Sequence, residues 1–198
     1  MATQRSPFNT LEEYLDLDAA AEYKSEYLSG QIYAMAGGSP EHNRIGFNVI
    51  TALGAQLSGA PCIGYTSDQR IKAGGLYTYP DVTVICGQPR FSEGRKDTLL
   101  NPNLIVEVLS PSTEAYDRGE KFAHYRQIES LQEYVLISQD KPRIERYLRQ
   151  PDNTWNYTAA DGLQAALSLN SIGCTLKLEQ VYTDVELQPY LQTGRDDE

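Results

Sequence analysis

The stretch Asn101-Pro-Asn-Leu-Ile-Val-Glu-Val-Leu-Ser110 decides the fold, because apolar residues occupy both faces of the strand that it predicts. Alternate residues of a strand point to opposite faces, so Ile105, Glu107 and Leu109 share one face. The opposite face carries only apolar side chains, namely Leu104, Val106 and Val108. Apolar residues on both faces are typical of a central strand buried between two layers. The stretch therefore predicts a sheet that is covered on both sides.

Glu107 is a carboxylate on this otherwise apolar strand. An unpaired buried charge is costly, so Glu107 needs a cation, a basic side chain or a proton as its partner. Residues that break local rules in this way often mark functional sites. An internal salt bridge would also satisfy the requirement, and both interpretations stay open from this strand alone.

The sequence before this strand predicts two helices separated by a hairpin. Thr10-Leu-Glu-Glu13 is a capping box that starts a short helix ending near Ala20. Strand-like runs at 23–28 and 31–36 flank the two-residue turn Ser29-Gly30. Ser39-Pro40 then starts a long helix that ends before Gly59. Its inner face carries an apolar residue at every fourth position: Ile45, Val49, Leu53 and Leu57.

The remaining elements are mostly strands. Strands are expected at 62–72, 77–86 and 104–109, and Pro111-Ser-Thr then starts a second long helix that ends near Leu131. Further strands follow at 133–138, 143–148 and 155–159, and a short segment at 176–191 closes the chain. This order predicts an α/β fold, with an α+β mixed sheet flanked by helices, in a single domain over residues 1–198. Residues 1–8 and 193–198 are expected to be loose tails.

Charge and cysteine content limit the classes of function. With 17 basic and 27 acidic residues the net charge is −10, which argues against tight, non-specific coating of nucleic acid. A local basic groove or bound cations can offset this charge, so nucleic acid is not excluded as a substrate. No apolar run is long enough for a membrane helix, and the N-terminus has no signal core. Cys62, Cys86 and Cys174 lack paired spacing, so we expect three reduced thiols in a cytoplasmic protein without disulfides.

Asp81 is the second carboxylate of interest, because it begins a strand-like run directly after Pro80. A turn or strand-capping role is the simpler interpretation when Asp81 is taken alone. If the strands of Asp81 and Glu107 run antiparallel, pairing Asp81 near Leu109 puts the two carboxylates on one face, about 7–8 Å apart. Two carboxylates at that separation can share a Mg²⁺ ion, which prefers oxygen ligands.

Lys121 lies on the same helical face as Tyr125 and Ile128, at spacings of i, i+4 and i+7. If Ile128 faces the sheet, Lys121 points toward the two carboxylates; the alternative is a solvated lysine within a surface charge cluster. His42, in the first turn of the helix that starts at Ser39, leans toward the inner face, although a packed, hydrogen-bonded histidine is the simpler interpretation. Glu26, in the first hairpin, equally suits an ordinary surface charge.

Pro80-Asp81, the strand around Glu107 and the spacing Asp117-x-x-x-Lys121-x-x-x-Tyr125 together resemble the PD-(D/E)xK nuclease superfamily. More closely, they resemble its Uma-two branch of endonuclease-type proteins, over about residues 11–182. The resemblance implies a restriction-endonuclease-like core. The superfamily has lysine two residues after the second acid, where this chain has Leu109. The Uma-two branch looks similar in this respect, with its basic residue on the next helix, here Lys121.

The resemblance implies metal-dependent hydrolysis of nucleic-acid phosphodiesters, with DNA as the expected substrate. Asp81 and Glu107 would bind Mg²⁺ or Mn²⁺, with Glu26 as a further ligand. Lys121 would orient the attacking water or stabilise the transition state. His42 would contact the phosphate or assist proton transfer.

Other catalytic classes find little support, because the chain has no nucleophile elbow, no phosphate-binding loop and no dinucleotide fingerprint. With only two histidines, His42 and His124, a histidine-rich metal site is not available. The alternative from another class is a catalytically inactive nuclease-fold scaffold, an interaction module for nucleic acid or protein and a candidate homodimer. The acidic charge favours the scaffold, and the presence of all three types of site residue favours the enzyme.

Overall fold

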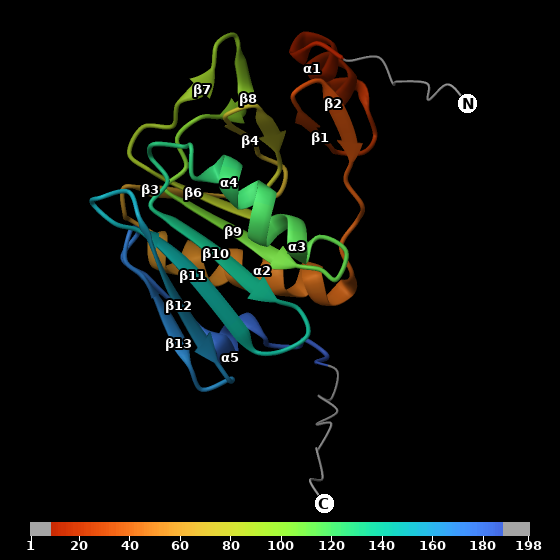
Figure 1. The fold of residues 1–198 in the computed structure, drawn as a ribbon. Helices are drawn as coiled ribbons and strands as arrows, with labels where there is room; N and C mark the ends of the chain where they lie inside the picture. Colours follow the sequence, from red (N-terminus) through yellow and green to blue (C-terminus); the bar gives the residue numbers. More distant parts are fainter. Residues whose placement is uncertain (1–8, 188–198) are drawn as a thin grey trace, which may run out of the picture.

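A computed structural model describes residues 9–187 of the chain (Figure 1). Both predicted tails, at 1–8 and 193–198, lie outside the described residues, as does the end of the segment predicted at 176–191. None of the helices between residues 9 and 187 has the length and apolar character needed to cross a membrane.

Strand β9 (Leu104–Leu109) lies inside a six-stranded mixed sheet. It pairs in parallel with β10 (Glu133–Ser138) and antiparallel with β6 (Val82–Cys86). The full strand order is β12-β11-β10-β9-β6-β3, and the outer strands are β3 (Cys62–Thr66), β11 (Arg143–Arg149) and β12 (Trp155–Asp161). The predicted mixed sheet is therefore confirmed.

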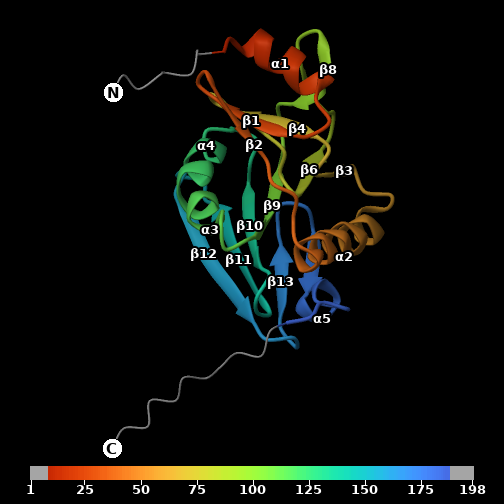
Figure 2. The same ribbon diagram turned by 90° about the vertical axis from the view of Figure 1, so that its right-hand side faces the viewer.

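All six residues of β9 are buried, because both faces of the sheet are covered. Helix α2 (Pro40–Leu57), the hairpin of β13 (Ala166–Leu169) and β14 (Cys174–Lys177), and α5 (Leu178–Val181) cover the face of Val106 and Val108. The opposite face is covered by α3 (Glu114–Tyr116), a π-helical turn η1 (Asp117–Lys121) and α4 (Phe122–Tyr125). Figure 2 shows α2 and the α3–α4 segment on opposite sides of the strands.

A second, smaller sheet lies beyond one end of the central sheet (Figure 1). Its order is β2-β1-β5-β4-β8-β7, with β2 (Gln31–Ala34), β1 (Ser25–Leu28), β5 (Leu76–Thr78), β4 (Arg70–Ala73), β8 (Arg95–Leu99) and β7 (Phe91–Ser92). Helix α1 (Leu11–Ala20) packs on it through Tyr14, whose ring stacks on Tyr27 at 5.0 Å between centroids. Ile71, Leu76 and Leu99 of this sheet join the cluster that packs on β9.

The N-terminal elements form as local sequence predicts. Thr10 and Glu13 exchange both capping-box hydrogen bonds at the start of α1. Ser29 and Gly30 both adopt positive φ, of 48° and 99°, as the tight turn between β1 and β2 requires. The apolar face of α2 is buried as predicted, and α2 ends at Leu57.

Two predicted strands are each divided between the two sheets. Residues 62–72 form β3 and β4, and residues 77–86 form β5 and β6, with the strands of each pair in different sheets. The predictions of single strands were wrong because apolar alternation continues across a point where the chain leaves one sheet for another. In the second case the break falls at Pro80, which cannot donate a ladder hydrogen bond.

The predicted long helix from Pro111 to Leu131 is shorter than expected. It begins at Glu114 and ends at Tyr125, with the π-turn in its middle. Arg149 of β11 donates hydrogen bonds to the carbonyls of Arg126, the C-cap residue, and of Ile128, in the loop that follows. These contacts from a distant strand hold the loop after α4, so an apolar stripe that continues to Leu131 does not keep the chain helical.

The prediction of three reduced thiols is wrong. Cys62 and Cys86 are directly paired residues of β3 and β6 and form a disulfide, whereas Cys174 is free and buried. Their separation of 24 residues in sequence hid a pairing that only the strand register creates. The cytoplasmic location stays a prediction, now without support from the cysteines.

The disulfide predicts the thiol count of the purified protein. Denatured without reductant, the protein should show one reactive thiol per chain, from Cys174, and three after reduction. Cys86→Ser should lower the free energy of unfolding by about 2–4 kcal/mol, since it removes a cross-link that restricts the unfolded chain. Thiol titration and urea unfolding measure both effects. Three thiols before reduction would contradict the cross-link, and Cys174→Ser, which should abolish the single thiol, is the control.

Candidate active site

Asp81 and Glu107 lie side by side where β6 and β9 meet. The register pairs Val82 with Val106, so the next step of the ladder brings Asp81 opposite Glu107. Asp81 Oδ2 accepts a hydrogen bond of 2.7 Å from the backbone N–H of Val108. The antiparallel pairing is as predicted, but pairing near Leu109 was wrong by two residues, because Asp81 precedes the strand and bends onto β9.

Lys121 lies at the centre of the carboxylates. Its Nζ is 3.0 Å from Glu107 Oε1, 3.1 Å from Glu26 Oε1 and 3.5 Å from Asp117 Oδ1. The side chain is only 6% exposed, so these contacts form with little competition from water. The π-turn brings this buried ammonium over the end of β9, and the alternative of a solvated lysine is therefore wrong.

Hydroxyl groups hold the two glutamates in place. Tyr125 of α4 donates a hydrogen bond of 2.6 Å to Glu107 Oε1. Thr78 at the end of β5 donates a short hydrogen bond to Glu26 Oε1. Glu26 is 8% exposed, so the alternative of an ordinary surface charge is wrong. These bonds fix the carboxylates of both glutamates relative to Lys121.

His42 approaches the site from the first turn of α2. Its Nε2 lies 3.4 Å from Asp81 Oδ2, and Ser39 at the N-cap accepts from the His42 backbone N–H. Burial lowers the pKa of His42, but the hydrogen bond and charge of Asp81 outweigh it, so the pKa lies above its usual value. The neighbouring Asp81 therefore stabilises the protonated, positively charged form of His42.

The site holds more negative than positive charge. Burial raises the pKa of Glu107 to about 8, with Asp81 and Asp117 acting in the same direction and Lys121 against it. Burial alone would lower the pKa of Lys121, but Glu107, Glu26 and Asp117 raise it well above its ordinary value. Lys121 thus stays charged among four acidic side chains, and of these Glu107 favours binding a proton or a cation.

These residues line a cavity of about 460 Å³. Glu26, His42, Asp81, Glu107, Asp117 and Lys121 all face it. The structure therefore brings together all five candidate residues that the sequence singled out, from β1, α2, the start of β6, β9 and η1. Their catalytic and ligand roles stay predictions.

Asp117 and Tyr125 are functional candidates that sequence reasoning missed. Asp117 is 3% exposed and lies one helical turn before Lys121, and its i, i+4 spacing was the available signal. Tyr125 marked a helical face and the last position of the spacing that begins at Asp117, and nothing local showed that its hydroxyl reaches Glu107. Burial raises the pKa of Asp117, with Lys121 acting against it and Asp81 in the same direction.

The donor set suits a hard divalent cation, although it is not a ready-made cage. Within residues 9–187, no three His, Cys, Asp or Glu side chains stand as a metal-binding group. Lys121 occupies the space between Glu26 and Glu107. Mg²⁺ commonly binds through one or two carboxylates and keeps several waters, and Asp81 and Glu107 both line the cavity.

A mixed sheet with acidic residues on adjacent central strands and a lysine on the following helix defines the restriction-endonuclease-like class. The chain belongs to the Uma2 family, whose model is described as "Putative restriction endonuclease" and matches residues 11–179.

Two relatives and one solved structure support this assignment. The uncharacterized protein slr1290 of Synechocystis sp. is 42% identical over 186 residues, covering 89% of this chain and 94% of the relative. The uncharacterized protein sll1609 of the same organism is 38% identical over 163 residues, covering 81% of this chain and 92% of the relative. A crystal structure described as a putative nuclease belonging to DUF820 from Anabaena variabilis shares the fold, with a TM-score of 0.72, 20% identity and coverage of 88% of this chain and 97% of that one. The predicted fold class is thus confirmed.

The buried glutamate predicts how stability depends on pH without metal. The pKa of Glu107 is about 8 in the folded state against 4.5 ordinarily, so the folded protein holds a proton that the unfolded chain releases. Stability should therefore fall as pH rises from about 5 to 8, by at most about 1.4 kcal/mol per pH unit for one proton. Stability should fall further as pH rises above 6.5, because the pKa of His42 is also raised in the folded protein. Urea unfolding with a chelator present measures the slope.

Glu107→Gln should flatten this slope, because the amide does not titrate. Glu145→Gln is a matched control, since Glu145 is also buried on a strand but its two arginine partners lower its pKa. Equal slopes in wild type and Glu107→Gln would show that Glu107 is already ionised near pH 5.

Proposed function

We propose that the protein is a Mg²⁺- or Mn²⁺-dependent endonuclease that hydrolyses nucleic-acid phosphodiester bonds. The observation that carries this proposal is the buried excess of carboxylate around Lys121, at the end of β9 and open to a cavity. A structural ion pair needs one acid for one base. Here four acids face one lysine and one histidine, an excess that is costly without a further cation, and functional sites are where such costs are retained.

Asp81 and Glu107 would hold the cation, with Glu26 as a further ligand. The bound cation supplies a water of lowered pKa and offsets charge on the phosphate. Lys121 places a permanent positive charge 3.0 Å from Glu107, where it can donate to a phosphate oxygen as negative charge develops. His42, beside Asp81, can donate a proton to the leaving oxygen when it is charged.

The non-catalytic scaffold has one specific observation in its favour. Lys121 already contacts three carboxylates, so the cluster is partly neutralised without any metal. A scaffold needs neither cleavage nor a metal-dependent change in stability, and the following two experiments separate it from the enzyme.

Conservative changes at the acids test the chemistry. Glu107→Gln and Asp81→Asn should each reduce Mn²⁺-dependent cleavage of plasmid DNA at least about 100-fold, since each removes a charged ligand while keeping side-chain size. Gel assays over time, with circular dichroism for folding, measure this. Glu133→Gln is the matched control, because Glu133 is a fully buried glutamate of β10 that bonds the backbone of Asn170 and Ser171 away from the cavity. Wild-type rates in either site variant would refute the assignment.

Lys121→Met should separate catalysis from metal binding, because an ammonium is not a ligand. If Mg²⁺ binds with a dissociation constant of about 1 mM, about 10 mM Mg²⁺ should stabilise the folded protein by about 1.4 kcal/mol. This should raise the melting midpoint by roughly 2–4 °C. Lys121→Met should keep this shift and lose cleavage, whereas Glu107→Gln should lose both. Lys96→Met serves as a control, because Lys96 is exposed. An equal shift in wild type and Glu107→Gln at constant ionic strength would support the scaffold instead.

A further inference from the structure

The cavity that contains the carboxylates has aromatic rings in its wall and few basic side chains. Three tyrosines, Tyr33, Tyr79 and Tyr116, contribute to its wall. Among the residues that line it, Lys121 and His42 are the only basic ones, and Lys121 is engaged by three carboxylates. No arginine is among the lining residues. A phosphate chain entering this cavity therefore meets few side chains that could neutralise it.

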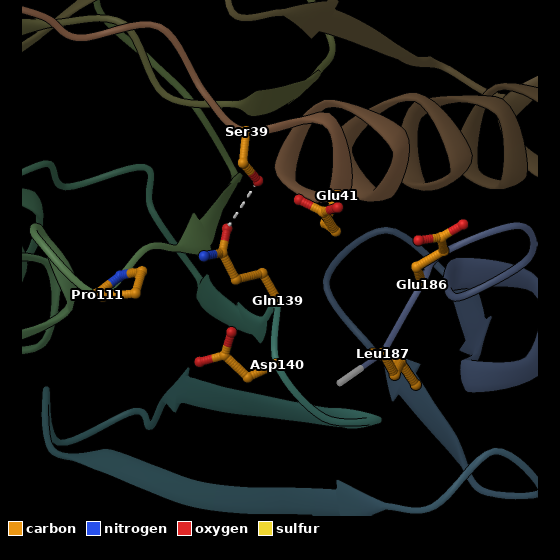
Figure 3. A pocket seen from close by; sticks show the side chains of 7 residues that line it. All are labelled: Ser39, Glu41, Pro111, Gln139, Asp140, Glu186 and Leu187. Atoms are coloured by element: carbon orange, nitrogen blue, oxygen red, sulfur yellow. Dashed lines mark hydrogen bonds between the residues drawn. The ribbon is translucent and has the colours of Figure 1, made fainter. Parts of the chain in front are cut away.

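The neighbouring cleft makes the surroundings still more acidic. A second cavity, of about 640 Å³, shares Ser39, Pro111 and Gln139 with the first. Its other lining residues are Glu41, Asp140, Glu186 and Leu187, and Figure 3 shows the three carboxylates around the Ser39–Gln139 hydrogen bond. Among the described residues that line this second cavity, three are acidic and none is basic.

A double helix is poorly suited to such surroundings. Duplex DNA binds proteins largely through phosphate neutralisation by lysine and arginine, and both of its strands carry phosphates to the surface. A single strand exposes its bases, and these can stack on aromatic rings. Only the few phosphates that enter the site then need to be neutralised. The lining of the cavity suits a single strand better than a double helix.

Tyr33 is the ring best placed to receive a base. It lies on the outer strand β2, is 48% exposed, and pairs in register with Glu26, so that both side chains project from the same face of the sheet. Tyr79 is held by hydrogen bonds of its hydroxyl to Arg70 and Asp18, and Tyr116 has Lys121 over its ring at 5.9 Å. Tyr33, whose hydroxyl donates to Gln31, is thus the most exposed of the three rings, and the other two are partly buried walls of the cavity.

We propose that the substrate is a single-stranded segment of nucleic acid, with a base stacked on Tyr33 while the adjacent phosphodiester enters the carboxylate site. This proposal rests on the proposed endonuclease function and names its substrate class. Recognition depends on stacking, so affinity depends weakly on salt, with a slope set by only one or two neutralised phosphates. Each neutralised phosphate of a single strand contributes about −0.7 to that slope.

The test uses a fluorescein-labelled 15-nucleotide DNA, the same sequence as RNA, and the DNA annealed to its complement. With Mn²⁺, wild type should cleave the single strands at least ten times more efficiently than the duplex, measured as kcat/KM. Tyr33→Leu should raise KM for single strands about 5- to 150-fold, the range expected for losing one base–aromatic stack, with kcat little changed. Tyr33→Phe should retain the wild-type KM, because the ring remains. Tyr23→Leu is the matched control, since Tyr23 is 65% exposed and outside the cavity lining.

Failure of this inference and failure of the nuclease function give different results. Equal cleavage of duplex and single strands, or an unchanged KM in Tyr33→Leu, overturns the single-strand proposal and leaves the endonuclease standing. If wild type cleaves none of the three substrates, the proposed function fails, and fluorescence anisotropy with the same labelled DNA decides the inference. Preferential binding of the single strand that weakens in Tyr33→Leu then supports it, and equal binding of both forms overturns it.

Discussion

The contact between Lys121 and the surrounding carboxylates is the interaction on which the other features of the site depend. Glu107, Glu26 and Asp117 come from β9, β1 and the π-turn, and each lies within 3.5 Å of one ammonium. Removing any one group from this cluster leaves its partners buried without compensation, which is a costly state. The fold must therefore hold three separate elements at one point, and the π-turn is the local distortion that delivers Lys121 to it.

Two supporting networks hold these elements in place. Arg70, which is 2% exposed, bonds to Asp18 and to the hydroxyl of Tyr79, and so ties α1 and β4 to the segment that leads into Asp81. On the other side, the Tyr134 hydroxyl donates to the carbonyl of Asp117 within the π-turn. Both networks are buried or partly buried, so they hold the acids in place against their mutual repulsion.

The net charge of −10 and the lining of the cavity agree with one another. A protein that relied on general attraction to phosphate would need basic side chains around its site. Here the basic side chains among the described residues of the lining are Lys121 and His42, and three tyrosines and four acidic side chains line the same cavity. A bound divalent cation would then attract phosphate only at the reacting position. This favours a substrate that is recognised through the nucleotides next to that position.

The sequence by itself determined the elements whose signals are local. The capping box at Thr10, the turn at Ser29-Gly30, the apolar stripe of α2 and the two-sided burial of β9 all follow from neighbours within a few residues, and the out-of-place Glu107 indicated a site. Strand register, the division of residues 62–86 between two sheets, the Cys62–Cys86 bond and the early end of the helix before Leu131 were decided by tertiary structure. Each of these depends on a partner distant in the chain, such as Arg149, which bonds the carbonyls that follow α4. The same is true of the bond from Tyr125 to Glu107, since side-chain chemistry alone does not specify which buried groups come into contact.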